Sequence, residues 1–414
     1  MKYSFTLFVL IFLACNLYGQ AGKKVPWSYI IDITPEEVAE MQSRTSYPSD
    51  VPNNTVEGLV PDYTLPDLLT TSSGRKIRTV RAWEKKRRPE LLEIFSNEMY
   101  GHVPGRLAGE HFVIDRVEEN AFDGLGRIKH ITIYLDATQE HSLHMLLAVP
   151  GRTDKRCPVF AGVNFYGLDS TLTGTRAYQW PYEKLLSEGF GLATIWRDEI
   201  CPDSGRSVGH GVRDLIVGDW GAISAWAWAL SRVMDYLETD MDVDASKVAL
   251  IGHSRLGKTA LWAGANDPRF AMVISNASGC CGASLSRRVF GENFNAIRRF
   301  THWFCPNFWK WDDSDFPTDQ HALAALIAPR PLYIAIGSLD FWCDPKGEWL
   351  TAVHCQPVYD LYGKKGLSHP DRMPEVGERD DAGWVAYKIR FGKHGIIPSD
   401  WDDYIAFARR VFGK

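Results

Sequence analysis

The sequence predicts an α/β fold, in which helices cover both faces of a central and mostly parallel β-sheet. The main observation is that short apolar runs alternate with helical stretches after Pro158, a pattern typical of buried parallel strands. Three earlier apolar runs, at 111–118, 129–135 and 143–149, predict an antiparallel start to the same sheet. A chain of 414 residues that is 45% hydrophobic and 23% charged is globular, which excludes a disordered chain, a collagen-like fibre and a coiled coil.

The elements expected after Pro158 follow the chain in order. The predicted strands are 159–164, 192–196, 247–252, 272–276 and 332–337. The predicted helices are 214–239, 255–265, 320–327, 345–362 and 400–412, with one earlier helix at 88–100.

The first nineteen residues are interpreted as a signal peptide. Lys2 precedes the apolar run 5–14, which is too short to span a bilayer, and cleavage is expected near Gly19. Cys15 offers an alternative, a lipid-modified cysteine. Either form predicts an exported protein, periplasmic or secreted, and no later segment is apolar enough to span a membrane.

Two regions are expected after the signal peptide. Residues 20–72, rich in Pro, Ser and Thr, are interpreted as an extended arm packed on the domain. Residues 73–414 are expected to form a single α/β domain. The net charge of −5 gives no electrostatic reason to expect nucleic acid as a partner, and nothing in the sequence determines the oligomeric state.

Cysteine usage predicts disulfides and no metal site. Eight cysteines are present, and seven remain once Cys15 is removed. Export to an oxidising compartment favours one or two disulfides among those of the last third. Without a C-x-x-C pair, neither a zinc site nor any other metal or cofactor is expected. The cysteines of the last third are Cys280, Cys281, Cys305, Cys343 and Cys355.

Ser254 is the candidate nucleophile. It lies in Gly252-His-Ser-Arg-Leu-Gly-Lys258, between a buried strand and a helix, as in the nucleophile elbow of α/β-hydrolases. The usual last glycine of that motif is replaced by Leu256, and Gly257 follows one residue later. The alternative interpretation is a serine that caps the helix.

A serine nucleophile needs a base and a carboxylate that orients the base, in the chain order Ser, acid, His for this fold. Asp340 follows the strand 332–337 and is the preferred acid, with Asp344 as the second choice because it precedes Pro345 and is placed to cap a helix. His394 is the preferred base because it lies in a Gly-flanked loop before the last helix. His369 and His354 are the other downstream histidines.

Several motifs resemble the glucuronoyl esterases, carbohydrate esterase family fifteen, especially the bacterial type. They are the elbow, residues 276–288, Phe290-Gly-Glu-Asn293, residues 340–348, Gly392-Lys-His-Gly395 and Asp400-Trp401. The resemblance implies a three-layer α/β-hydrolase sandwich that cleaves the ester between (4-O-methyl-)glucuronate on xylan and lignin alcohols.

By this resemblance, Ser254 is the nucleophile and His394 the general base, while Arg255 stabilises the oxyanion. The resemblance also implies that the glucuronate ring is held by Lys258, Glu292 and Trp342. One departure concerns the acid, because many members carry a glutamate where this chain has Ala277. We therefore expect Asp340 to orient His394.

The sequence is also compatible with two other functions. One is another carbohydrate esterase of the same fold, such as an acetyl-xylan or feruloyl esterase. The other is a carbohydrate-binding protein without catalysis, suggested by Ala277 and by the 15 tryptophans. Trp226, Trp228 and Trp262 are expected in the core, whereas Trp303, Trp309 and Trp311 are expected to border the site.

Overall fold

The computed structural model describes residues 53–151, 155–173, 179–205 and 211–413. The predicted signal peptide, Cys15 and the first part of the predicted arm lie outside these residues. Within them, no helix combines the length and the hydropathy that crossing a bilayer requires.

The centre of the domain is one ten-stranded sheet in the order β1-β2-β3-β5-β4-β6-β7-β8-β10-β9. Strands β5, β4, β6, β7, β8 and β10 run parallel to one another, and antiparallel pairs lie at both ends of the sheet. The strand bounds are β1 His111–Asn120, β2 Gly126–Tyr134, β3 Ser142–Pro150, β4 Cys157–Asn164, β5 Gly191–Trp196, β6 Val243–His253, β7 Met272–Asn276, β8 Leu332–Gly337, β9 Arg379–Asp380 and β10 Val385–Arg390.

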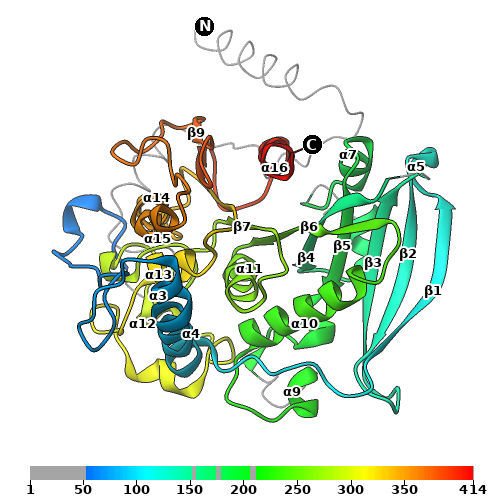
Figure 1. The fold of residues 1–414 in the computed structure, drawn as a ribbon, viewed down its shortest axis with the longest axis horizontal. Coiled ribbons are helices and arrows are strands. Elements are labelled where there is room, and N and C mark those ends of the chain that lie inside the picture. The colour runs from blue at the N-terminus through cyan, green and yellow to red at the C-terminus, as the bar shows by residue number, and fades with distance from the viewer. Residues whose placement is uncertain (1–52, 152–154, 174–178, 206–210, 414) are drawn as a thin grey trace, which may run out of the picture. The chain divides into compact units, whose positions relative to one another are not determined.

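Helices cover both faces of this sheet, which confirms the predicted three-layer α/β class (Figure 1). The longer helices are α4 Arg88–Phe95, α10 Ala222–Leu237, α11 Arg255–Asn266, α14 Pro345–His354 and α16 Pro398–Phe412. The shorter ones are α3 Val80–Ala82, α5 Ala121–Gly124, α6 Leu168–Thr173, α7 Tyr182–Ser187, α8 Arg197–Ile200, α9 Val212–Leu215, α12 Phe294–Ile297, α13 Gln320–Ala325 and α15 Gln356–Leu361.

Side-chain alternation along the central strands builds two separate cores. On β4, Val159 and Ala161 pack into the cluster that contains α10 and α11, whereas Phe160 packs on the other face against Trp401 of α16. A strand buried on both faces reads as a continuous apolar run, which is why the sequence revealed β4. Trp226, Trp228 and Trp262 are fully buried, as predicted.

Two predicted helices are interrupted. The expected helix 214–239 is instead α9 and α10, separated by an irregular segment that ends at Gly221. The Gly221 amide donates to the carbonyl of Tyr100, and a Cβ on this glycine would lie 2.1 Å from the carbonyl oxygen of Trp303. The expected helix 345–362 divides at Cys355 into α14 and α15. Long-range backbone contacts of this kind leave no periodic signal in the sequence.

The disulfide expectation was wrong for the cysteines of the last third, because Cys280, Cys281, Cys305, Cys343 and Cys355 are all free. Cys280 and Cys281 come closest, with sulfur atoms 3.9 Å apart and no bond between them. All seven cysteines of the described residues are buried.

Candidate active site

Three parallel strands bring the predicted triad residues to one edge of the sheet. Ser254 directly follows β6, Asp340 follows β8, and His394 follows β10. Because β6, β7, β8 and β10 are consecutive parallel neighbours, their carboxyl ends meet at one edge, where α/β proteins usually bind ligands.

Ser254 occupies a strained turn. Its backbone has φ 58° and ψ −132°, a conformation that non-glycine residues rarely adopt and that is typical of functional sites. The turn is tight, since a Cβ on Gly252 would lie 1.9 Å from the carbonyl oxygen of Leu256. A Cβ on Gly257 would lie 2.9 Å from the side chain of Ser278. Gly257, which lies one place later than the last glycine of the usual motif, therefore allows α11 to approach the turn at 277–279.

His394 is oriented by Asp340. Its Nδ1 lies 2.7 Å from Oδ2 of Asp340, whose side chain is fully buried. Because a carboxylate only accepts, Nδ1 carries the proton in this pair, and Nε2 is left with a lone pair. Ser254 and His394 line the same cavity, of about 310 Å³. This arrangement suits general-base activation of a serine.

The loops that carry Asp340 and His394 are bound to each other. The amide of Leu339 donates to the carbonyl of Gly392, and the amide of Ser338 donates to that of Arg390. A Cβ on Gly337 would lie 2.3 Å from the Gly392 carbonyl oxygen, so a glycine is required where the two chains meet. The guanidinium of Arg390 also donates to the carbonyl of Gly395 at 2.6 Å. The distance between acid and base is thus fixed by backbone contacts.

The second choices for acid and base have other roles. Asp344 accepts from Nε of Arg288 at 2.7 Å and from the amide of Gly347, where it caps α14. The ring of His369 lies 3.6 Å from Asp380, and its side chain is 70% exposed. His354 lies in α14, and burial lowers its pKa.

His253 packs against the base, with ring centroids 4.5 Å apart. Its Nδ1 donates to the amide oxygen of Asn276 at 2.7 Å. Burial, assisted by the nearby His394, holds the pKa of His253 well below its ordinary value. The neighbour of the base is therefore neutral at physiological pH and adds no positive charge.

Arg255 is held by an acid that sequence reasoning missed. Its guanidinium pairs with the Asp203 carboxylate, which also accepts from Nε2 of His302 and Nε1 of Trp303, both at 2.8 Å. A fourth group on this carboxylate is Arg197, at 2.5 Å. Burial alone would raise the pKa of Asp203, but the His302 hydrogen bond and the arginine charges lower it. Asp203 lies in an irregular segment where no motif marks it.

Lys258 and Glu292 form a buried ion pair in the cavity. Nζ of Lys258 lies 2.8 Å from Oε2 of Glu292 and donates to the carbonyl of Ser278 at 2.5 Å. The two residues are only 2% and 6% exposed, which excludes their interpretation as solvated surface residues. Burial would lower the pKa of Lys258, but the charge of Glu292 raises it, so the amine stays protonated.

Aromatic rings form one wall of the cavity. Phe300 stacks on Trp303 with ring centroids 4.0 Å apart and an angle of 5°. The guanidinium of Arg299 lies 5.0 Å from the ring centroid of Trp342, and that of Arg255 lies 4.8 Å from the centroid of Trp303. Trp303 and Trp342 line the cavity, as predicted. Phe300 and Arg299 also line it, although the sequence did not predict them.

Two tryptophans were wrongly placed at the site. Trp309 and Trp311 are not among the residues that line the cavity, and both pack against the core instead. The indole Nε1 of Trp311 donates to Glu98 at 3.0 Å. Crowding in the sequence did not distinguish rings that face the cavity from rings that support it.

Cys343 occupies the space between Ala277 and the base. Its Sγ lies 3.4 Å from the carbonyl oxygen of Ala277 and 3.6 Å from Nδ1 of His394. Burial raises the pKa of this thiol well above its ordinary value, so the sulfur is protonated. Ala277 offers no carboxylate to His394, and the thiol of Cys343 lies against the His394 ring.

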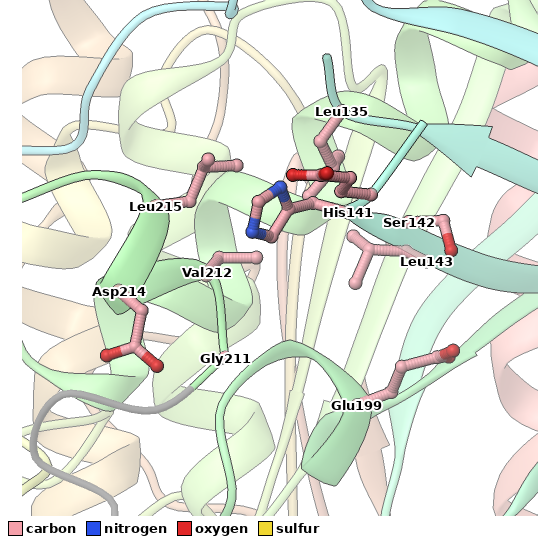
Figure 2. A pocket seen from close by; sticks show the side chains of 10 residues that line it. Leu135, His141, Ser142, Leu143, Glu199, Gly211, Val212, Asp214 and Leu215 are labelled. Atoms are coloured by element: carbon pink, nitrogen blue, oxygen red, sulfur yellow. The ribbon is translucent and has the colours of Figure 1, made fainter. Parts of the chain in front are cut away.

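A second cavity of about 320 Å³ lies beside the β2–β3 connection (Figure 2). Its lining includes Glu199 and Asp214, and His141, whose Nδ1 lies 2.7 Å from Asp136. Its lining residues hold no serine on a strained turn and no paired acid and base beside one. We therefore assign the site to the cavity at Ser254.

The fold and this cavity together define an α/β-hydrolase. The family model of the fungal glucuronyl esterases matches residues 213–363. A carbohydrate esterase, MZ0003, from an unknown prokaryotic organism is 39% identical over 395 residues, covering 85% of this chain and 90% of that protein. The glucuronoyl esterase of Solibacter usitatus is 40% identical with a TM-score of 0.82, covering 86% of this chain and all of that one.

A third relative agrees with these. The glucuronoyl esterase of Teredinibacter turnerae is 33% identical, with a TM-score of 0.79 over 91% of this chain and 99% of that one. The chain belongs to the glucuronoyl esterases of carbohydrate esterase family fifteen. It is a carboxylic ester hydrolase, which sets aside the alternative of a binding protein without catalysis.

Proposed function

We propose that the chain hydrolyses the ester between the carboxyl group of (4-O-methyl-)glucuronate on xylan and lignin alcohols, with Ser254, His394 and Asp340 as its catalytic triad. The observation that carries the proposal is the Lys258–Glu292 pair buried in the same cavity as Ser254. Relatives named 4-O-methyl-glucuronoyl methylesterases, such as that of Podospora anserina at 37% identity over 228 residues, support the substrate class.

In this mechanism Ser254 Oγ attacks the ester carbonyl while Nε2 of His394 accepts its proton. Asp340 holds the opposite ring nitrogen and stabilises the imidazolium that forms. The alcohol leaves with the proton from His394, and the glucuronoyl group remains on Ser254 as an ester. Water then attacks that ester with His394 again as the base, which regenerates the serine.

Oxyanion stabilisation is assigned to the start of α11. The backbone N–H of Arg255, the residue after the nucleophile, lies where this fold places one oxyanion donor. Its guanidinium, held by Asp203, adds a positive charge at the cavity. Donors fixed in place before the reaction stabilise the developing charge without reorganising.

The acyl group is assigned to the polar end of the cavity. A carboxylate and an ammonium group can bond to the hydroxyls of a uronate ring, and the face of Trp342 can pack on its C–H groups. An acetyl group has no hydroxyls that could form hydrogen bonds with Lys258 and Glu292. Phe300 and Trp303 line the same cavity and offer apolar ring atoms to the alcohol.

Export is proposed as well, on the strength of Lys2 and the apolar run that follows it. A lipid-modified Cys15 is the alternative to a cleaved signal peptide. Labelling with a fatty-acid analogue distinguishes the two, since only the lipid-modified form incorporates it.

The test is a panel of esters with the wild type and Ser254→Ala. We expect hydrolysis of methyl and benzyl esters of glucuronate and 4-O-methyl-glucuronate by the wild type, and its loss by several orders of magnitude in Ser254→Ala. Preferred turnover of acetyl-xylan or feruloyl esters would instead indicate a different carbohydrate esterase. Unchanged turnover in Ser254→Ala would refute the assigned nucleophile.

A further inference from the structure

Three groups beside the serine have the chemistry of metal ligands. A carboxylate oxygen of Asp340, Sγ of Cys343 and a ring nitrogen of His394 all lie within 4.8 Å of one another. Asp340 and Cys343 are buried, and His394 opens to the cavity. Oδ1 of Asp340 is also buried and has no hydrogen-bond partner among the described residues.

The distances fit a tetrahedral ion. Bonds of about 2.0 Å to nitrogen or oxygen and about 2.3 Å to sulfur place neighbouring ligand atoms roughly 3.3–3.6 Å apart. The separation of Sγ from Nδ1 of His394 is already 3.6 Å. The Asp340 oxygen, now 2.7 Å from that nitrogen, would move by less than about 1 Å. The fourth position would be taken by a water molecule from the cavity.

We propose that Asp340, Cys343 and His394 form a binding site for a thiophilic divalent cation such as Zn²⁺ or Cd²⁺, and that its occupation stops hydrolysis. A thiolate beside an imidazole and a carboxylate favours these ions over Mg²⁺ or Ca²⁺, which prefer oxygen ligands alone. The inhibition rests on the proposed role of His394, whereas the binding does not.

Binding exchanges one proton for one ion. The thiol of Cys343 loses its proton to become a thiolate, while the proton of His394 moves from Nδ1 to Nε2 so that Nδ1 can bind the metal. A neutral imidazole bound to metal through Nδ1 therefore carries its one proton on Nε2. That nitrogen must accept the proton of Ser254, so the occupied enzyme has no base. Asp340 likewise no longer holds the ring for catalysis.

The test is a titration of the purified enzyme with Cd²⁺. We expect a thiolate-to-cadmium absorption band in the near ultraviolet that saturates at one equivalent. Activity on a glucuronate ester should fall in parallel and return after addition of EDTA. The band depends on no turnover, so it tests the site even if the proposed substrate is wrong.

Cys343→Ala and Cys355→Ala are the matched variants, each losing one buried thiol. Cys355 lies at the junction of α14 and α15, away from the cavity lining. Each is compared with its own rate in EDTA, after circular dichroism has verified folding. We expect Cys343→Ala to lose the band and to need at least about tenfold more Cd²⁺ for half inhibition, and Cys355→Ala to match the wild type.

Two results would overturn the proposal. One is a wild-type enzyme that shows no band and keeps its activity at several equivalents of Cd²⁺. The other is a Cys343→Ala variant that retains the band and the inhibition, which would place the ion elsewhere, such as at Cys280 and Cys281, whose sulfurs lie 3.9 Å apart.

Discussion

Nδ1 of His394 lies 2.7 Å from Oδ2 of Asp340, and the loops that carry the two residues are joined by backbone hydrogen bonds. The acid therefore reaches the base from the end of β8, although Ala277 leaves no carboxylate at the end of β7. Among the described residues, Asp340 is the one carboxylate bonded to this imidazole, so no other group should replace it when it is removed.

Asp340→Asn is the direct test of that acid. An amide in place of the carboxylate favours the wrong ring tautomer, so kcat should fall by about three to four orders of magnitude. The control is Asp344→Asn, which breaks the buried pair with Arg288 and should cost about 3–5 kcal/mol of stability while leaving kcat within a few-fold. Rates and thermal unfolding of both variants check this, and near-wild-type turnover of Asp340→Asn would refute the role.

Asp203→Asn tests how Arg255 is held. Loss of the charge that pairs with the guanidinium should lower kcat by about ten- to a hundredfold and leave KM nearly unchanged, because the oxyanion exists only in the transition state. The control is the same change in an Arg255→Ala background, where it should have little further effect. Equal losses in both backgrounds would indicate that Asp203 acts on something else.

Glu292→Gln tests the proposed sugar contact. Weakening a charged hydrogen bond in the cavity should raise KM for glucuronate esters by about tenfold or more, with little change for an acetyl ester of the same alcohol. Lys258→Met should instead destabilise the fold by about 3–5 kcal/mol, because it leaves Glu292 buried without its partner. The double variant should recover part of that loss. A KM that rises equally for both esters would argue against ring recognition.

Asp313 gives stability a defined pH dependence. Burial raises the pKa of this carboxyl from 3.8 to about 7, and it accepts from the amide of Phe294 at 3.0 Å. Between pH 3.8 and about pH 7 this carboxyl is neutral in the folded protein but ionised in the unfolded chain. Its contribution to the free energy of unfolding is therefore complete below pH 3.8 and is lost as pH rises through about 7.

Asp313→Asn cannot titrate, so its stability relative to the wild type should improve by up to about 4 kcal/mol between pH 4 and pH 7. Denaturant unfolding across this range measures the difference. Asp312→Asn, at an exposed neighbouring carboxylate, should show no such trend. Parallel stability curves for Asp313→Asn and the wild type would contradict the buried assignment.

Sequence patterns predicted the parts of the molecule that depend on local chemistry. The runs 272–276 and 332–337 match β7 and β8, because parallel strands that are buried on both faces are mostly apolar. The order of Ser254, Asp340 and His394 also located a compact site, because each follows a strand whose carboxyl end reaches the same edge.

Tertiary contacts account for what the sequence did not reveal. Asp203 becomes important only where Arg255, His302 and Trp303 converge on it, and these lie far from it in the chain. The break before α10 likewise depends on Gly221 approaching the Trp303 backbone. Neither contact produces a repeat or a spacing that a single sequence can show.

Residues 53–57 help to define the smallest fragment that should be fully functional. Nδ2 of the Asn53 side chain donates to the Gly291 carbonyl at 2.7 Å, the Gly291 backbone amide donates to the Asn54 carbonyl at 2.6 Å, and Glu57 pairs with Arg288. These contacts clamp the turn that presents Glu292. A shortened enzyme that starts at residue 73 would lose every one of them, so the smallest fragment with full substrate affinity must include Asn53.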